Sequence, residues 1–178
     1  MTLAPPDRPL LLLWGFMGAG KSTVGRCVAS RAKVEFLDLD QHIETQSGRR
    51  ISQIFADEGE ASFRRLEADA LRAQLARKGR RVIALGGGTL LDHVLRAEAM
   101  ERSYVLTLEV TIDQVLARTA QDSARPLLSG SDPREAAERL FAARSGAYRS
   151  VHDSLPTARS SEAAVASLVL ERWRGSRS

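Results

Sequence analysis

The residues best suited to chemistry stand at 15–23, where the sequence reads GFMGAGKST. This stretch matches G-x-x-x-x-G-K-[ST], a pattern in which backbone N–H groups of a glycine-rich loop converge on phosphate oxygens. Lys21 can reach the outer phosphates as a point charge, and the Ser22 hydroxyl is a suitable ligand for Mg²⁺. The sequence therefore predicts a phosphate-binding loop. The alternative is a glycine-rich turn that happens to precede a basic residue.

Two carboxylates end the next apolar segment, VEFLDLD at 34–40. In a parallel α/β sheet ligands bind at the carboxyl ends of the strands, so Asp38 and Asp40 are predicted to lie beside the phosphate loop. Residues two apart in an extended segment point to the same side, and both carboxylates are therefore expected to face the site. For Asp38 alone, an aspartate that merely terminates the strand is the alternative.

Three consecutive glycines, Gly86, Gly87 and Gly88, follow another apolar run. Such a turn lets the backbone approach a ligand closely and offers donor N–H groups, although a tight turn is the alternative. This strand ends without an aspartate, so a conventional Walker B carboxylate is missing and Asp38 is available for the Mg²⁺ shell. Arg64 lies on a predicted helix, where an arginine is most often solvated, and its spacing alone assigns it no function.

The elements that must position these residues alternate between strand and helix. The apolar run before the phosphate loop predicts a buried strand, and a helix is predicted to begin at the loop with its positive N-terminal dipole facing the anion. Later helical signals are broken at Gly48 and near Gly59, and Asp132 is predicted to cap another helix. This alternation predicts a three-layer α/β/α fold with a central parallel sheet of about five strands. Strands are predicted within 9–14, 34–40, 80–85, 103–110 and 154–158.

The composition suits one domain of ordinary core size, with 178 residues of which 43% are hydrophobic. The net charge of +4 comes almost wholly from arginine, and basic residues interleaved with aromatics do not occur, so nucleic acid is not an expected partner. The apolar run after Arg8 is shorter than the roughly 18 residues of a membrane span and predicts a strand rather than a signal peptide. A single Cys27 excludes an internal disulfide. The segment at about 172–178, with Arg172, Arg174 and Arg177, is expected to be a solvated basic tail.

Taken in order, GFMGAGKST, FLDLD, GRRISQIFADEGEASFRRLE, LGGGT and ARPLL resemble the shikimate kinase family, small P-loop kinases related to the nucleoside monophosphate kinases. The resemblance covers residues 10–150 or so. It implies transfer of the ATP γ-phosphate to the 3-hydroxyl of shikimate, on the route to chorismate and the aromatic amino acids. It also implies one P-loop kinase domain over 1–178, with a substrate-binding helical region at about 40–80 and a mobile lid at about 120–132. A cytoplasmic monomer without nucleic-acid or membrane partners is expected.

On the ATP side, the resemblance implies that the phosphate loop binds ATP and that Mg²⁺ is held by Ser22 and, through water, by Asp38. Arg118 matches a family residue near the adenine, and Arg125 matches a lid arginine with a catalytic role beside Lys21. The residues expected to contact ATP are Gly18, Ala19, Gly20, Lys21, Ser22, Thr23, Arg118 and Arg125.

On the shikimate side, the resemblance implies that Asp40 accepts a hydrogen bond from the reacting hydroxyl and that two arginines clamp the carboxylate. The backbone N–H of the glycine turn is expected to contact the substrate as well. Bidentate arginines suit a planar carboxylate, and this chain is rich in arginine but has only three lysines. The residues expected to bind shikimate are Asp40, Arg64, Gly86, Gly87, Gly88 and Arg144.

The sequence departs from the family pattern late in the chain. Family members usually carry Arg-x-Pro-x-Tyr, whereas this chain reads Arg144-Ser-Gly146-Ala-Tyr148. Gly146 is expected to loosen the helix end that aims Arg144, so Arg64 is expected to hold the larger share of shikimate affinity. The segment SLPTARSSEAA also departs from the family, and adenine contacts are not assigned there.

Two other functions compete with this interpretation. One is a kinase of the same fold that acts on another small molecule, such as gluconate or a nucleotide; the paired arginines and the glycine turn favour a carboxylated polyol instead. The other is a GTPase-type switch. The chain contains no asparagine, so the Asn-Lys-x-Asp guanine signature cannot exist.

Replacing the loop lysine tests the phosphate-loop assignment. Lys21→Ala should abolish turnover and leave the fold intact, because the lysine contributes charge to the transition state rather than packing to the core. Steady-state kinetics and circular dichroism measure the two effects. An unchanged spectrum together with a kcat within about twofold of wild type would contradict the assignment.

Overall fold

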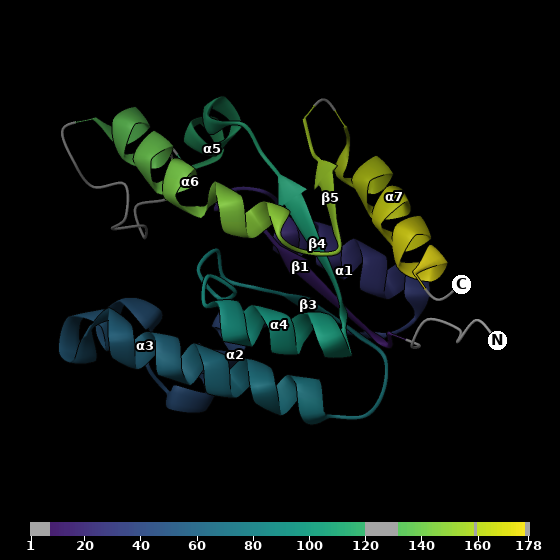
Figure 1. Cartoon of the computed structure of the whole chain (residues 1–178), viewed down its shortest axis with the longest axis horizontal. Helices are drawn as coiled ribbons and strands as arrows, with labels where there is room; N and C mark the ends of the chain where they lie inside the picture. Colours follow the sequence, from purple (N-terminus) through teal and green to yellow (C-terminus); the bar gives the residue numbers. More distant parts are fainter. Residues whose placement is uncertain (1–7, 120–131, 159, 177–178) are drawn as a thin grey trace.

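The structure is a computed structural model that describes residues 8–119, 132–158 and 160–176. Within these ranges the chain forms one sheet of five parallel strands in the order β2-β3-β1-β4-β5 (Figure 1). The predicted α/β fold with a parallel sheet of about five strands is confirmed. The strands are β1 (Leu10–Trp14), β2 (Glu35–Asp38), β3 (Arg81–Ala84), β4 (Tyr104–Glu109) and β5 (Asp153–Pro156).

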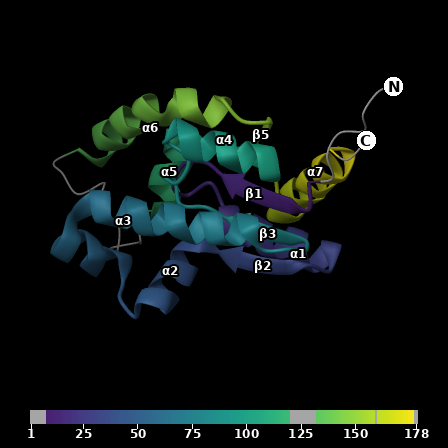
Figure 2. The same ribbon diagram turned by 60° about the horizontal axis from the view of Figure 1, so that its bottom comes forward.

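Helices cover both faces of the sheet, as the alternating sequence pattern predicts. Helices α1 and α7 lie side by side on one face, and α4 and α6 cover the other, with α3 packed beside α4 (Figures 1 and 2). The helices are α1 (Lys21–Ala32), α2 (Leu39–Ser47), α3 (Ile51–Ala76), α4 (His93–Arg102), α5 (Ile112–Thr119), α6 (Pro133–Arg149) and α7 (Glu162–Gly175).

The interior strands have no solvated face, which explains their composition. Every residue of β1 and of β3 is buried, and β1 is the uninterrupted apolar run LLLLW. A strand buried on both faces reads as continuous apolar sequence because neither side of the pleat meets water. The apolar stretch after Arg8 is therefore the central strand of the domain.

Several local signals are confirmed by the backbone. Gly48 ends α2 in the left-handed conformation, with φ of 66°. Gly59 has φ of 80° and ψ of 171°, and it bends α3 where the sequence predicts a break. Asp132 caps α6 by accepting hydrogen bonds from two backbone N–H groups of the first turn. These residues satisfy helix ends whose own backbone groups lack intrahelical partners.

The structure corrects the predicted conformation around Asp40. Strand β2 ends at Asp38, whose Oδ1 accepts a hydrogen bond from the backbone N–H of Gln41 at 3.3 Å. Aspartate favours the N-cap position, so α2 begins immediately after the strand and Asp40 lies in its first turn. Contrary to the prediction, the two carboxylates do not lie two residues apart on one extended strand, because Asp40 belongs to α2. Asp38 therefore both caps α2 and lies beside the phosphate loop.

The predicted basic tail is also corrected. Helix α7 continues to Gly175, and Arg172 donates hydrogen bonds to Asp153 Oδ1 at 2.6 Å and to the Ser154 carbonyl at 2.9 Å. This arginine therefore joins α7 to β5 instead of lying free in solvent, whereas Arg177 falls outside the described residues. The predicted lid residues 120–131, with Arg125, also fall outside them. Among the helices that are described, none combines the length and the apolar character that a membrane crossing requires.

Candidate active site

The loop between β1 and α1 has the backbone that its glycines predict. Gly15, Gly18 and Gly20 have φ of 133°, 73° and 85°, a region that side chains disfavour. The first backbone N–H groups of α1 receive no side-chain cap, and a Cβ on Gly20 would meet nothing within 4 Å. Lys21 Nζ donates to the carbonyl oxygens of Gly15 and Phe16, both at 3.0 Å. The loop therefore fits a polyphosphate, which a helix N-terminus and a lysine both attract.

Ser22 and Asp38 meet at the start of α1 as predicted. The Ser22 hydroxyl donates to Asp38 Oδ2 at 2.5 Å, so two oxygen ligands stand together beside the loop. Mg²⁺ prefers oxygen ligands and usually takes only one or two from the protein, with water and phosphate completing its shell. This pair fits that requirement. The described residues contain no cluster of three or more histidines, cysteines or acids that would form an all-protein metal site.

Asp40 is the most perturbed acid of the site. Its Oδ1 is buried, and the described residues offer it no hydrogen-bond donor. Burial is the main cause that raises its pKa from 3.8 to about 6, and the negative charges of Glu67 and Asp38 add to it. Lys21 and Arg64 act in the opposite direction. A buried carboxylate with an unused acceptor oxygen is suited to receive a hydroxyl hydrogen bond from a ligand.

The glycine triplet lies against these groups, and sterics explain its composition. A Cβ on Gly86 would lie 2.7 Å from Glu67 Oε1 and 3.0 Å from Asp40 Oδ1. A Cβ on Gly88 would lie 2.5 to 2.6 Å from the guanidinium atoms of Arg64. None of the three glycines has a positive φ, so they are required for close approach and not for an unusual backbone conformation. The turn thus brings backbone directly onto the predicted substrate side chains.

Arg64 is held by two glutamates of its own helix. Its Nη1 donates to Glu67 Oε2 at 2.6 Å, and its Nη2 donates to Glu60 Oε1 at 3.0 Å. Glu67 is 1% exposed and also accepts a hydrogen bond from the Thr89 hydroxyl at 2.5 Å. Sequence reasoning assigned Glu67 no role. Its position three residues after Arg64 on a predicted helix was the available signal, because such residues face each other.

Arg144 reaches the same turn from α6. It is 8% exposed, and its Nη1 would lie 3.5 Å from a Cβ on Gly87. The expectation that Gly146 loosens this helix end is wrong, because α6 continues to Arg149. Glycine lowers helix propensity, but packing of the buried Tyr148 side chain on the same turn holds the helix. The hydroxyl of Tyr148 donates to the Gly87 carbonyl at 2.9 Å, a contact that sequence reasoning did not find.

The remaining ATP-side residues lie around the phosphate loop. Arg118 donates from Nη1 to the carbonyl oxygen of Gly18 at 2.6 Å, so it lies at the phosphate loop, and its role near the adenine stays a prediction. Ala19 is buried and Thr23 is exposed. The predicted role of Arg125 concerns a residue outside the described ranges.

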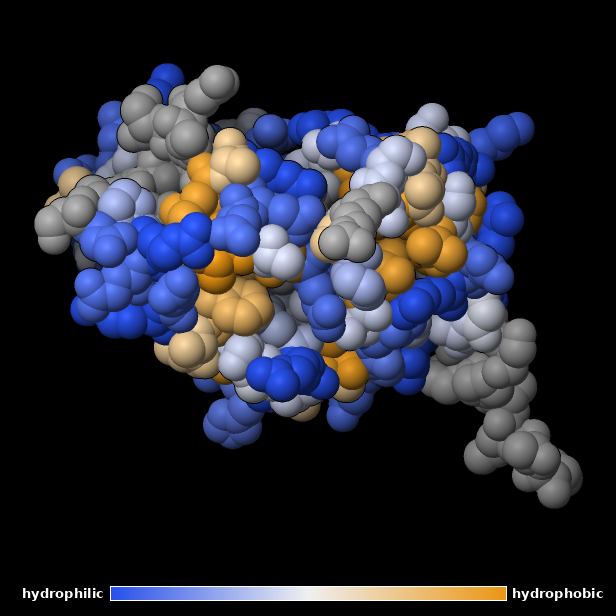
Figure 3. Space-filling model, turned by 90° about the horizontal axis from the view of Figure 1, so that it is seen from above, coloured by the Kyte–Doolittle hydropathy of each residue, from blue (hydrophilic) through white to orange (hydrophobic). Residues whose placement is uncertain are grey.

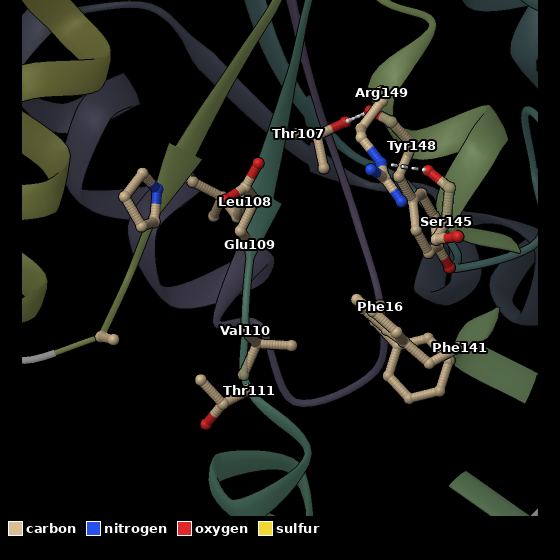
Figure 4. A pocket seen from close by; sticks show the side chains of 12 residues that line it. Phe16, Thr107, Leu108, Glu109, Val110, Thr111, Phe141, Ser145, Tyr148 and Arg149 are labelled. Carbon is tan, nitrogen blue, oxygen red and sulfur yellow. Dashed lines mark hydrogen bonds between the residues drawn. The ribbon is translucent and has the colours of Figure 1, made fainter. Parts of the chain in front are cut away.

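Two hollows adjoin these elements. One of about 710 Å³ is lined by Arg64, Glu67, Gly88 and Thr89, among others. The other, of about 340 Å³, lies between the carboxyl end of β4 and α6, where Phe16 meets Phe141 with ring centroids 5.4 Å apart (Figure 4). Seen from above, the molecule is largely hydrophilic with scattered hydrophobic patches (Figure 3). Of the predicted substrate residues, Arg64 and Gly88 line the larger hollow. The smaller hollow touches the phosphate loop through Phe16.

The fold and the site together define the class of protein to which this chain belongs. A phosphate loop after the first strand of a parallel sheet, with acids and arginines converging on a glycine turn beside it, is the arrangement of a P-loop kinase that acts on a small molecule. Family comparison makes the assignment specific. The shikimate kinase family model matches residues 17–174, and the chain belongs to the shikimate kinase family.

Individual relatives agree with this assignment. A shikimate kinase of Francisella philomiragia is 45% identical over 143 residues, which are 80% of this chain and 81% of that protein. A structure of shikimate kinase from Acinetobacter baumannii in complex with shikimate matches with a TM-score of 0.89 and 35% identity, covering 94% of each chain. A gluconokinase from Sinorhizobium meliloti matches with a TM-score of 0.61 and 15% identity, over 98% of this chain and 95% of that one, and shares the fold.

Removing the charge of Asp40 should separate activity from stability. Asp40→Asn should lower kcat about 100-fold or more, because the amide cannot take a proton from the substrate hydroxyl. Because its pKa is raised from 3.8 to about 6, Asp40 lowers the stability of the folded state as the pH rises across this interval, and the full cost remains at higher pH. Without ATP or Mg²⁺, the variant should therefore gain about 2 kcal/mol of unfolding free energy at pH 7.5. Steady-state kinetics and urea unfolding measure the two effects.

The pH dependence of the wild-type enzyme provides the second test of Asp40. Its kcat/KM for shikimate should fall as the pH decreases through about 6, where this carboxylate takes up a proton. Asp57→Asn is a matched control, since the Asp57 side chain is 65% exposed on α3, and it should change neither activity nor stability. A raised shikimate KM with an unchanged kcat in Asp40→Asn would assign Asp40 to binding instead of catalysis.

Proposed function

We propose that this protein is a shikimate kinase that transfers the γ-phosphate of ATP to the 3-hydroxyl of shikimate, on the route to chorismate and the aromatic amino acids. The observation that carries the proposal is the convergence of Asp40, Arg64 and Arg144 on the Gly86–Gly88 turn beside the phosphate loop. Because the chain belongs to the shikimate kinase family, shikimate is the substrate proposed to bind at this turn. The Acinetobacter relative, whose structure contains shikimate, has the same fold over nearly the whole chain.

The two arginines would hold the substrate carboxylate. Arg64 lies against Gly88 and Arg144 against Gly87, so two guanidinium groups flank one turn from opposite helices, α3 and α6. Guanidinium groups match the planar carboxylate with paired hydrogen bonds, and a lysine could not replace that geometry. The backbone N–H groups of the turn would add donors that carry no side-chain entropy cost. A bound shikimate would therefore be fixed at its carboxylate end by charge and at its ring by the turn.

Asp40 would receive the hydrogen of the 3-hydroxyl. Its free acceptor oxygen and its raised pKa suit a group that takes a proton late, as the hydroxyl oxygen attacks the γ-phosphorus. Phosphoryl transfer has a loose transition state in most analyses, so positioning and charge contribute more than early proton removal. Asp40 would thus orient the nucleophile first and accept its proton as the new P–O bond forms.

The phosphate loop would hold ATP, and Ser22 with Asp38 would hold Mg²⁺. When bound, Mg²⁺ supplies positive charge that offsets the charge of the phosphate oxygens. Lys21 would move from the loop carbonyls of Gly15 and Phe16 toward the outer phosphates, because both acceptors are neutral and a phosphate is not. Arg118 would contact the nucleotide beside the loop, and Arg125 in the predicted lid would add charge once water is excluded.

The proposed enzyme is a single kinase domain. It is proposed to act as a monomer on ATP and shikimate, which are both small molecules. A cytoplasmic location is proposed because ATP is available there.

Substrate specificity is the direct test of this function. With ATP and Mg²⁺, the protein should phosphorylate shikimate with a kcat/KM at least about 100-fold above that for quinate, gluconate or a nucleoside monophosphate, because substrates that leave the site's buried polar groups unpaired lose transition-state binding. A coupled assay for ADP release on this panel measures the ratios. Preference for gluconate would replace the proposal by the sugar-acid alternative.

The contributions of the two arginines form a second test. Arg64→Ala and Arg144→Ala should each weaken shikimate binding by ~2–4 kcal/mol, the range for truncating one partner of a desolvated charge pair. The losses should be comparable, because Arg144 is buried within a continuous helix and Arg64 is fixed by two glutamates. Titration calorimetry with shikimate measures both. Arg139→Ala on α6 is the control, since its side chain is 74% exposed and should not affect binding. Loss below about 1 kcal/mol for either site arginine would remove it from the carboxylate clamp.

A further inference from the structure

We infer that Tyr148 is a positioning residue that fixes the glycine turn and Arg144 relative to the phosphate loop. The inference rests on the shikimate kinase activity proposed above and adds a residue that this proposal does not use. Tyr148 lies on α6, is 4% exposed, and contacts parts of the site that come from four other segments of the chain.

The hydroxyl of Tyr148 stands between two groups proposed to bind shikimate. It donates to the Gly87 carbonyl at 2.9 Å, and the positive charge of Arg144 lies close enough to act on the pKa of this hydroxyl. Both contacts meet at one point, since a Cβ on Gly87 would be 3.5 Å from the Tyr148 hydroxyl oxygen and 3.5 Å from Arg144 Nη1. One oxygen is therefore bonded to the backbone of the turn and lies beside the guanidinium group that flanks it.

The same point borders the phosphate loop. The carbonyl oxygen of Gly15, which accepts a hydrogen bond from Lys21 Nζ, would be 3.4 Å from a Cβ on Gly87. The turn that would contact shikimate and the loop that would contact ATP are thus in near van der Waals contact. A small displacement of Gly87 changes the distance between the two substrates' binding groups, and phosphoryl transfer depends on that alignment.

The ring of Tyr148 is held by aromatic neighbours from the first strand and the loop. Its edge-to-face partner is Trp14 at the end of β1, with ring centroids 4.7 Å apart and an interplanar angle of 69°. Phe16 in the phosphate loop lies 6.4 Å away at 81°. Aromatic pairs in this geometry contribute beyond their buried area and restrict the rings to one orientation. The hydroxyl is consequently aimed at Gly87 by packing that involves the loop itself.

The backbone of Tyr148 is anchored as well. The Thr107 hydroxyl of β4 donates to the Tyr148 carbonyl oxygen at 2.8 Å (Figure 4). This bond fixes the last turn of α6 to the sheet, close to Gly146, where the helix lacks a side chain. The main chain of Tyr148 is therefore fixed, its ring is packed between aromatic neighbours, and its hydroxyl lies between two groups proposed to bind shikimate, the Gly87 carbonyl and Arg144. If Tyr148 only filled space in the core, its aromatic ring would be enough and its hydroxyl would not be needed.

Deleting the hydroxyl tests the inference. Tyr148→Phe keeps the ring packing but leaves the Gly87 carbonyl without its donor and removes the hydroxyl oxygen beside Arg144. The KM for shikimate and its dissociation constant should each rise about five- to 30-fold, the consequence of leaving buried hydrogen-bonding groups unpaired. The KM for ATP should stay within about twofold, because the ring still supports Phe16.

A matched variant separates positioning from general loss of stability. Tyr104 is also buried, and its hydroxyl donates to Asp153 Oδ2 at 2.8 Å near the amino end of β4, away from the proposed site. Tyr104→Phe should lower the melting temperature about as much as Tyr148→Phe, with both KM values unchanged. A purely structural role of Tyr148 would reduce the fraction of active protein and leave the shikimate KM where it is.

The outcomes are distinct. A selective rise of the shikimate KM in Tyr148→Phe, absent from Tyr104→Phe, supports the inference. An unshifted shikimate KM in an active Tyr148→Phe enzyme overturns it, and so does an equal shift in Tyr104→Phe. Wild-type protein that does not phosphorylate shikimate overturns the proposed function and, with it, this inference.

Discussion

The register between parallel strands is the constraint on which the site depends. In β2 and β1, Asp38 and Leu13 are both paired with Ala84 of β3, so the three strands end at the same level of the sheet. Helix α2 begins directly after Asp38, the phosphate loop follows Trp14, and the glycine turn follows Leu85. A shift of one residue in either pairing would move one of these segments by about 3.3 Å and reverse its side chains.

Charge is concentrated where the sheet ends, and this concentration has an energetic cost. Burial disfavours ionisation of Asp40, and the nearby negative charge of Glu67 adds to this effect. Arg64 and the Thr89 hydroxyl offset the charge of Glu67, which leaves Asp40 as the acid with an unused acceptor. A site that kept every charge satisfied would be more stable and would have no group ready for a substrate hydroxyl. The instability of ionised Asp40 and its suitability for catalysis thus have one cause.

The lack of side chains at the glycines of the site is as important for its geometry as the side chains around them. The Gly86–Gly88 turn lies against Asp40, Glu67 and Arg64, and a methyl group at either end of it would occupy their space. Gly15 is limited in the same way, since a Cβ there would lie 2.4 Å from the Leu108 carbonyl oxygen of β4. Close backbone approach therefore joins the nucleotide side of the site to the substrate side. Tyr148 completes that junction from a helix distant in sequence.

The sequence by itself determined the parts of the protein that depend on a few adjacent residues. The phosphate loop needs glycines in the left-handed region and a lysine at the helix start, the buried strands need continuous apolar residues, and the breaks at Gly48 and Gly59 need glycine; each was predicted and observed. The resemblance of ordered motifs also selected the family correctly. Local requirements of backbone conformation and burial restrict the residue type at a position, so they can be recognised from the sequence.

Only the tertiary structure decided which side chains meet across long intervals. Glu67 and Thr89 are 22 residues apart and Tyr148 and Gly87 are 61 apart, and their hydrogen bonds exist because strand register and helix packing bring them together. The burial of Arg144 despite Gly146 and the attachment of Arg172 to β5 likewise followed from packing. Local propensity at these positions was weak or favoured another outcome, and the larger free energy of burial and hydrogen bonding in the assembled fold prevailed.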